Sequence, residues 1–285
     1  MRAPRLVALA VAVAFCGVLA PDAVAQKPAP KKPDPIEAKK PAPIDVKPIV
    51  AKLKSGEEDQ IRAALDDARL AGPPAAAAAP AIAEVLSKGL SLSVTQSAVE
   101  TLGDLESDAG SAVLAQYASH RNLKVRRAAV KSLARTKGTA AAAALKHALS
   151  DADPVVRGTA ASGLGSLKAR EAVPELFIAL DHRVNEAAAS IGQLCTMEQC
   201  EQLAGRVGKV PFDVMTGGLD PVLFRPAAEI NDDAKVKIVG RIRELGTMEG
   251  NKFLREVQKR WPENGSKRVR QAIDQAVLAT SGGAQ

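Results

Sequence analysis

Two cysteines five residues apart are the side chains best placed to form a covalent bond. Cys195 and Cys200 are the cysteines that follow the N-terminal apolar run, which itself holds Cys16. In a continuous helix, residues five apart have Cα atoms roughly 8–9 Å apart, too far for a disulfide, so a bond requires the chain to turn between them. Thr196 could begin that turn and cap a helix starting at Met197. We predict a disulfide that staples this corner; a redox-active or metal-binding pair is the alternative.

The histidines do not have the spacing of a catalytic or metal-binding group. His120, His147 and His182 include no pair at the i, i+4 spacing that places two ligands on one helix face. No glycine-rich phosphate loop or nucleophile elbow is present, and Gly163 and Gly165 lie inside a helical stripe, which favours a close-packing role. The sequence therefore predicts no enzymatic activity, no metal site and no cofactor.

A charged surface is the next candidate site. Arg127, Lys131 and Arg135 recur every four residues, which places them on one face of a single helix. Glu100 and Asp104 occupy the corresponding places one unit earlier, so the basic stripe does not continue as a nucleic-acid groove requires. With only 2% aromatic residues, the chain also lacks the rings of a base-stacking protein. We predict a polarised groove for another protein; the alternative is an ordinary solvated face.

A second candidate surface is the irregular segment 207–230, which contains three prolines and a pair of glycines. Phe212, Met215, Phe224 and Arg225 have the residue types that dominate protein-binding hot spots, and insertions in repeat proteins often decorate a binding face. The alternative is a degenerate repeat whose apolar residues fold back onto the neighbouring units.

A repeat of 31 residues must position these side chains. Four sets of like residues keep this step: Val94, Val125 and Val156; Ala98, Ala129 and Ala160; Leu102, Leu133 and Leu164; Leu114, Leu145 and Leu176. Within one unit, Val125, Ala129 and Leu133 fall on a single stripe of a helix. A second helix follows after a short breaker, so each unit is a helical hairpin whose free stripe must be buried against the next unit. We expect about six such units.

The stretch VRRAAVKSLARTKGTAAAAALKHALSDADPVVRGTAASGLGSLKAREAVPELFIALD, residues 125–181, resembles HEAT repeats of the phycobilisome-lyase type. The resemblance implies an all-α fold, an α-solenoid forming a right-handed superhelix of HEAT-like hairpins, with the helices that begin Val-Arg on the concave side. It also implies a ladder in which an Asp of a turn bonds an Arg six residues later. Asp151 and Arg157 match this pattern, whereas His120 stands where the Asp would precede Arg126.

The domain boundaries follow from composition. Residues 1–25 have the basic start, apolar run and small-residue end of a secretory signal peptide. Residues 26–48 form a Lys/Pro-rich segment with six lysines, which we expect to be a flexible linker. Residues 49–280 are predicted to form the solenoid, and residues 281–285 a disordered tail.

These features favour an exported, non-catalytic scaffold that binds another protein in the periplasm or outside the cell. One alternative is a binder of envelope polymers or membrane surfaces, led by the lysines of the linker and limited to weak contact by screening at ordinary salt. A lyase-type enzyme subunit is the remaining alternative.

Overall fold

The computed structural model describes residues 44–136 and 138–281, all within one compact unit. The predicted signal peptide, most of the linker and residues 282–285 lie outside the described residues. The described chain consists of α-helices, three short 3-10 segments and one isolated bridge between Val207 and Val210, and it contains no strand. The prediction of an all-α solenoid is confirmed.

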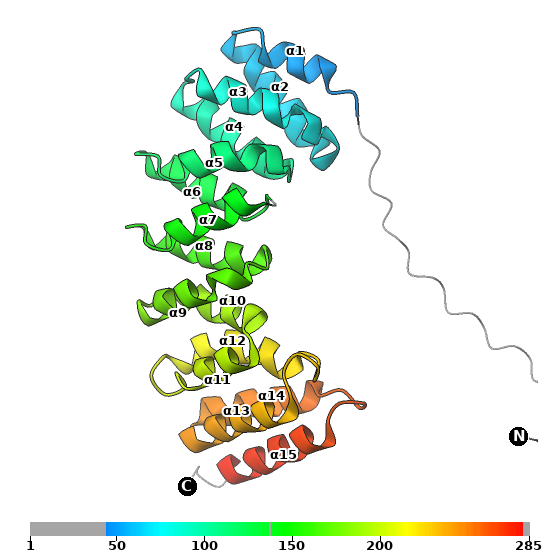
Figure 1. Ribbon diagram of the computed structural model, residues 1–285, viewed down its shortest axis with the longest axis vertical. Coiled ribbons are helices and arrows are strands. Elements are labelled where there is room, and N and C mark those ends of the chain that lie inside the picture. Colours follow the sequence, from blue (N-terminus) through cyan, green and yellow to red (C-terminus); the bar gives the residue numbers. More distant parts are fainter. Residues whose placement is uncertain (1–43, 137, 282–285) are drawn as a thin grey trace, which may run out of the picture. The chain divides into compact units, whose positions relative to one another are not determined.

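The helices form two layers, stacked in chain order from α1 to α15 (Figure 1). The first layer holds α2 (Glu58–Ala71), α4 (Leu92–Asp104), α6 (Leu123–Leu133), α8 (Pro154–Ser166), α10 (Glu186–Leu194), α12 (Phe212–Phe224) and α14 (Met248–Arg260). The second layer holds α3 (Ala79–Ser87), α5 (Ser111–Tyr117), α7 (Thr139–Ala148), α9 (Val173–Asp181), α11 (Met197–Ala204), α13 (Asp232–Leu245) and α15 (Lys267–Ser281). Each first-layer helix packs on the next one of its layer, so every unit is covered by its neighbours.

Two predicted boundaries need correction. Helix α1 (Lys47–Leu53) begins inside the segment assigned to the linker, because Pro48 is tolerated in the first helical turn and Ile49 and Leu53 are buried against the first hairpin. At the other end, α15 extends to Ser281, one residue into the predicted tail.

The 31-residue step is visible in the helix starts. Helices α4, α6 and α8 begin at Leu92, Leu123 and Pro154. Asn122 caps α6 and Asp153 caps α8 with side-chain oxygens that accept backbone N–H bonds, which satisfies amides that have no partner inside the helix. All twelve residues of the four repeated sets are at most 1% exposed. The stripe read from the sequence is therefore the core of the stack.

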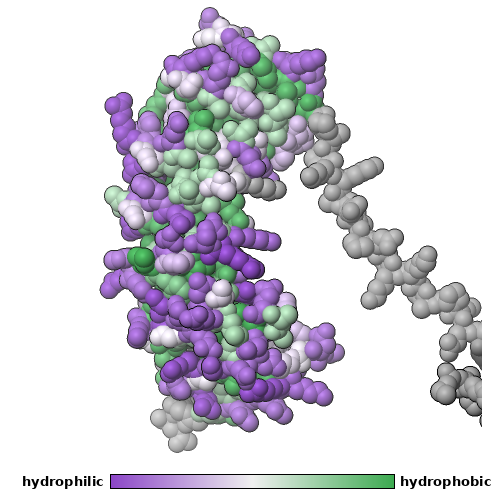
Figure 2. Space-filling model, in the orientation of Figure 1, coloured by the Kyte–Doolittle hydropathy of each residue, from purple (hydrophilic) through white to green (hydrophobic). Residues whose placement is uncertain are grey.

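Small residues let consecutive helices of the first layer approach closely. A Cβ atom on Gly103 would collide with Ser132 of the next first-layer helix, and one on Gly163 would lie 2.8 Å from the Cβ of Ala134. Figure 2 shows that apolar residues gather at the surface over the N-terminal hairpins, whereas polar side chains cover much of the C-terminal half. Little area is buried per residue, so stability depends on repetition of the unit.

The segment 207–230, for which an insertion and a degenerate repeat were both open, is helical over Phe212–Phe224 and forms part of a repeat unit. It contains α12, which packs against α10, and α12 with α13 adds a hairpin to the expected number. The described residues therefore hold seven pairs, from α2/α3 to α14/α15, preceded by α1. Pro221 lies inside α12, where tertiary packing of the fully buried Met215 and Leu219 outweighs its cost to the helix.

Candidate functional site

The acidic half of the predicted groove is engaged within the protein. Glu100 and Asp104 lie on α4, and both face Arg69 of α2: Nη2 of Arg69 is 3.7 Å from Oε2 of Glu100, and its Nε is 3.4 Å from Oδ2 of Asp104. Asp104 also forms an ion pair with Arg135, which follows α6. These side chains thus join three consecutive first-layer helices.

Two of the three basic side chains, Arg127 and Arg135, also form ion pairs within the protein. Nε and Nη2 of Arg127 donate to the two carboxylate oxygens of Asp153 at 3.0 and 2.7 Å, which links α6 to the start of α8. The hydrogen bonds from Arg127, with help from the backbone N–H of Val156, hold the pKa of Asp153 down at about 2. Lys131 is exposed and forms no ion pair with any residue from 44 to 136 or 138 to 281.

The structure therefore changes the interpretation of this surface. Arg127 and Arg135 bind neighbouring units, so Lys131 is the member of the basic triad whose charge faces solvent unpaired within the described chain. Exposed ion pairs of this kind contribute roughly 0.2–1 kcal/mol each, too little to decide stability. Their geometric effect is larger, because each pair fixes how one helix sits on the next. That a partner binds here stays a prediction.

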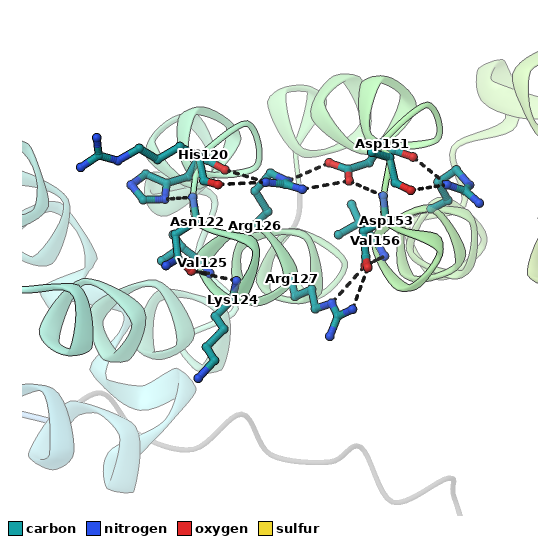
Figure 3. A network of polar contacts seen from close by, with 12 residues as sticks. His120, Asn122, Lys124, Val125, Arg126, Arg127, Asp151, Asp153 and Val156 are labelled. Atoms are coloured by element: carbon teal, nitrogen blue, oxygen red, sulfur yellow. Dashed lines mark hydrogen bonds and ion pairs between the residues drawn. The ribbon is translucent and has the colours of Figure 1, made fainter.

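A second set of contacts between units, the turn ladder, runs along the turns between hairpins and is centred on Arg126 and Asp151 (Figure 3). Nε and Nη2 of Arg126 donate to the carboxylate of Asp151 at 2.9 and 3.3 Å, and its Nη1 donates to the backbone oxygen of His120 at 3.1 Å. Arg126 therefore connects the turn before its own helix to the turn before α8. Asp151 in addition accepts the backbone N–H of Asp153 at 2.8 Å, and His120 Nδ1 accepts that of Asn122 at 3.1 Å.

The pairing of Asp151 with Arg157 needs correction. Nη1 of Arg157 donates to the backbone oxygens of Asp151 and Ala152 at 2.8 and 3.0 Å, and the Asp151 carboxylate belongs to Arg126 of the preceding unit. The residues were correctly identified, but the charged bond runs between units and not within one turn. His120 takes over the turn-forming hydrogen bond of the missing Asp.

The predicted disulfide is present at the corner between α10 and α11. Cys195 and Cys200 are bonded, with Cα atoms 5.4 Å apart, and both are fully buried. Thr196 caps α11 in a reciprocal pair of hydrogen bonds with Gln199, as the required turn predicted. Arg225 donates from Nη1 to the backbone oxygen of Cys195 at 2.7 Å. Burial of both sulfurs favours a structural staple over a redox-active pair, because thiol exchange needs access to a sulfur.

The proposed anchors of segment 207–230 pack inward. Met215 is fully buried. Phe212 contacts Phe253 edge-to-face with ring centroids 5.8 Å apart, and Phe224 contacts Trp261 at 5.7 Å. The alternative reading, in which the apolar residues fold back onto the stack, describes their positions, and Arg225 has the internal role given above.

Several contacts between charged residues of different units were missed from the sequence. Arg126 lies 25 residues before Asp151, and Asp181 lies 25 residues before Arg206, with which it forms a two-bond pair at 2.8 Å. An offset of 25 residues between an Arg and an Asp, slightly shorter than the repeat, was the available signal, with the order of the two residues reversed in the second pair. The position that breaks the ladder is equally informative: 25 residues after Arg157 stands His182.

The described part of the chain, residues 44–136 and 138–281, holds neither a cluster of metal ligands nor a helix that could span a membrane. There, no group of three or more His, Cys, Asp or Glu side chains is placed to hold a metal ion. No helix of this part is long and apolar enough to cross a membrane.

The comparisons with known proteins agree with the resemblance read from the sequence. The family model described as HEAT repeats matches residues 79–162. No curated protein matches the chain.

Among solved structures, similar ones are the complex of CpcE and CpcF of phycocyanin lyase from Nostoc sp. PCC7120 and an engineered protein. The lyase structure is 18% identical, covers 89% of this chain and 98% of its own, and has a TM-score of 0.42. The engineered protein is 17% identical, covers 84% of this chain and 98% of its own, with a TM-score of 0.41. A designed armadillo repeat protein in complex with the peptide (KR)4 is 14% identical, covers 83% of this chain and 100% of its own, and has a TM-score of 0.42.

Proposed function

We propose that this solenoid of HEAT-type repeats is a non-catalytic scaffold of the bacterial cell envelope that binds another protein. The proposal rests on the ion pairs that join consecutive first-layer helices, formed by Arg69, Asp104, Arg127 and their partners. Helices held in register present a continuous surface of several units, and a surface ordered before binding loses less entropy when a partner docks.

The envelope assignment rests on two features of the sequence and structure. Residues 1–25 have the pattern of a signal peptide, and Cys195 is bonded to Cys200, as suits an oxidising compartment. Export predicts that the protein purified from its native envelope begins at Gln26 and shows no free thiol. N-terminal sequencing that finds Met1 on the mature protein would contradict export.

The first-layer face of α4, α6 and α8 is the proposed binding surface, with Lys131 as its orienting charge. Charges at the rim of an interface act mainly on the association rate, so K131E should slow capture of the partner and change its salt dependence. K252E, on the exposed side of α14, is the charge-matched control and should leave the rate unchanged. Equal rates for K131E and the unchanged protein would remove Lys131 from the interface.

The Lys/Pro segment supports the second candidate, a binder of anionic envelope surfaces. Its six lysines would carry that contact. Deleting residues 26–43 removes most of the segment and leaves α1 intact, because α1 starts at Lys47. A scaffold keeps its protein partner after this deletion, as measured by affinity capture from cross-linked envelopes. Loss of envelope association with no protein partner captured would favour the tail-led function.

An enzyme subunit of the lyase type is tested on the purified protein itself. A scaffold is expected to carry neither pigment nor metal, which absorption spectra and elemental analysis measure. A stoichiometric bound chromophore would contradict the non-catalytic proposal.

A further inference from the structure

The turn ladder contains a complete rung at Arg126. Its Nη1 is held by the backbone oxygens of His120 and Arg121 at 3.1 and 3.3 Å, which leaves Nε and Nη2 pointing to the next unit. There the carboxylate of Asp151 accepts both at 2.9 and 3.3 Å. A guanidinium held in this way presents two parallel N–H donors, a fork that matches the two oxygens of a carboxylate.

One unit later the same fork has no carboxylate opposite it. Nη1 of Arg157 is held by the backbone oxygens of Asp151 and Ala152, the equivalents of the two oxygens that hold Arg126. Nε and Nη2 of Arg157 have no acceptor among the described residues. The next turn brings His182 to this place, and His182 and Arg157 line a common cavity. At this step of the turn ladder the arginine is in place, but the carboxylate that would pair with it is replaced by His182.

The cavity has a volume of about 390 Å³ and lies between α7, α9 and the turns that follow them. The carboxylates that line it are already neutralised: Asp151 by Arg126 at 2.9 Å, and Glu175 by Lys146 at 2.6 Å. Arg157 is thus the lining cation without a counter-charge. An anionic group entering the cavity would meet net positive charge despite the two acidic neighbours.

Two further features of the cavity describe the rest of the ligand. The side chain of Glu175, which is 37% exposed, lines the cavity, and its carboxylate can accept an N–H from the ligand. Ile178, which is 59% exposed, lines the same cavity and offers an apolar contact. A carboxylate, an N–H group and an adjoining aliphatic group occur together in a peptide that carries an acidic residue beside an aliphatic one.

We propose that this cavity binds the carboxylate of an acidic side chain from a partner protein, next to an aliphatic residue, and that this carboxylate completes the ladder at Arg157. The side-chain oxygens occupy the position relative to Arg157 that Asp151 occupies relative to Arg126. The proposal rests on the proposed scaffold function for the source of the peptide. It names a contact at the turns, separate from Lys131 and the first-layer face.

The test is a titration of the full oxidised protein with the blocked dipeptide Ac-Leu-Glu-NH2, followed by the side-chain Nε–Hε signal of Arg157 in nitrogen-15 NMR spectra. The isosteric Ac-Leu-Gln-NH2 is the matched control ligand, and glutarate tests a free carboxylate. We expect the Glu dipeptide to shift the Arg157 signal with a Kd of about 1 mM, as suits one charged contact and a small apolar one. The Gln dipeptide should bind at least about tenfold more weakly, because the bidentate charged bond is lost.

Two variants keep the test decisive if one of them is poorly folded. R157Q removes the fork, and H182D supplies a carboxylate from the chain itself; each should weaken the Glu dipeptide by about tenfold or more. H147D places the same charge change on the exposed side of α7 and should leave binding as it is.

Equal binding of the Glu and Gln dipeptides, no shift at Arg157, or full binding by both R157Q and H182D would overturn the proposal. Tighter binding of glutarate than of the dipeptide would also overturn it, in favour of a free dicarboxylate. A partner captured in cells without any dipeptide response would refute this inference alone and leave the scaffold function standing.

Discussion

At the scale of single residues, Asp153 shows how one side chain serves both a helix and a contact between units. Its carboxylate caps α8 by accepting the N–H of Val156 at 3.0 Å and binds Arg127 of the preceding first-layer helix. The two functions can be separated, because an asparagine oxygen caps a helix as well as an aspartate does but carries no charge.

The pH dependence of stability should report the charged contact. The pKa of Asp153 is held at about 2 in the folded protein, below its ordinary value of 3.8, first by the hydrogen bonds from Arg127. A depressed pKa means that the contribution of Asp153 is fully present above the ordinary value and is lost as the pH falls towards 2. Thermal unfolding followed by circular dichroism between these values should show the loss.

Two substitutions at this position distinguish the cap from the charge. At neutral pH, D153N should lower the Tm modestly and D153A should lower it further, because only the alanine variant loses the cap. At the acid end of the range the unchanged protein and D153N should converge. If D153N follows the unchanged protein at every pH, the Arg127 contact contributes nothing measurable.

At the scale of elements, the corner around α10 is where the regular repeat gives way to a tighter arrangement. Helix α10 carries Cys195 at its end and packs on α12 at Gly192 and Gly218, where backbone meets backbone. The disulfide turns the chain into α11, and the glycines allow α12 to take the place of a regular first-layer helix.

The staple should contribute a small, measurable part of the stability. In the chain-entropy model, closing this short loop stabilises the folded protein by about 2 kcal/mol. The free energy of unfolding of C195S/C200S, measured by denaturant unfolding, should therefore be lower by about that amount. The fold should survive, since Thr196 still caps α11. Two reactive thiols in protein purified from the envelope without reductant would show that the bond does not form there.

The close contact of α10 and α12 makes a sharper test. A Cβ on Gly192 would collide with the backbone oxygen of Gly218, which cannot move aside like a side chain, so G192A should cost more than about 2 kcal/mol. Gly240, inside α13, has no atom within 4 Å of an added Cβ. G240A is therefore the matched control and should stabilise the protein by about 0.5–1 kcal/mol, the helix-propensity difference. Denaturant unfolding of both variants measures the contrast; a harmless G192A would mean that the helices are farther apart.

The hairpins of the central units were predictable because periodicity states which residues face the core. Val125 and Leu133 could be assigned to the buried stripe without knowing their contacts. Helix α12 could not, since Pro221 and the Gly217–Gly218 pair oppose a helix locally and only packing on α10 overrides them.

The contacts between charged residues were less predictable for a related reason. Helical spacing places Arg127 and Arg135 on an exposed face, but it does not say that Asp153 and Asp104 of the neighbouring units lie within reach. Exposed arginines that were interpreted as binding residues are therefore paired with neighbouring units, Arg127 with the next one and Arg135 with the preceding one. The disulfide was an exception, because two cysteines and one turn leave few geometries.

The whole molecule is a stack of similar units, and we propose that the surface that they form together binds a protein. The ion-pair ladders and turn ladders fix neighbouring units, and the surface over α4, α6 and α8 follows from that order. We propose that partner binding belongs to this solenoid and not to the Lys/Pro segment.

Photo-crosslinking in living cells tests that claim most directly. A photoreactive amino acid replaces Ser162, which is exposed on α8 of the first layer, or Lys39 in the Lys/Pro segment, and captured proteins are identified by mass spectrometry. The account predicts a protein captured from position 162, and the same protein after residues 26–43 are deleted. Capture from position 39 alone, or loss of the partner from position 162 when the segment is removed, would contradict it.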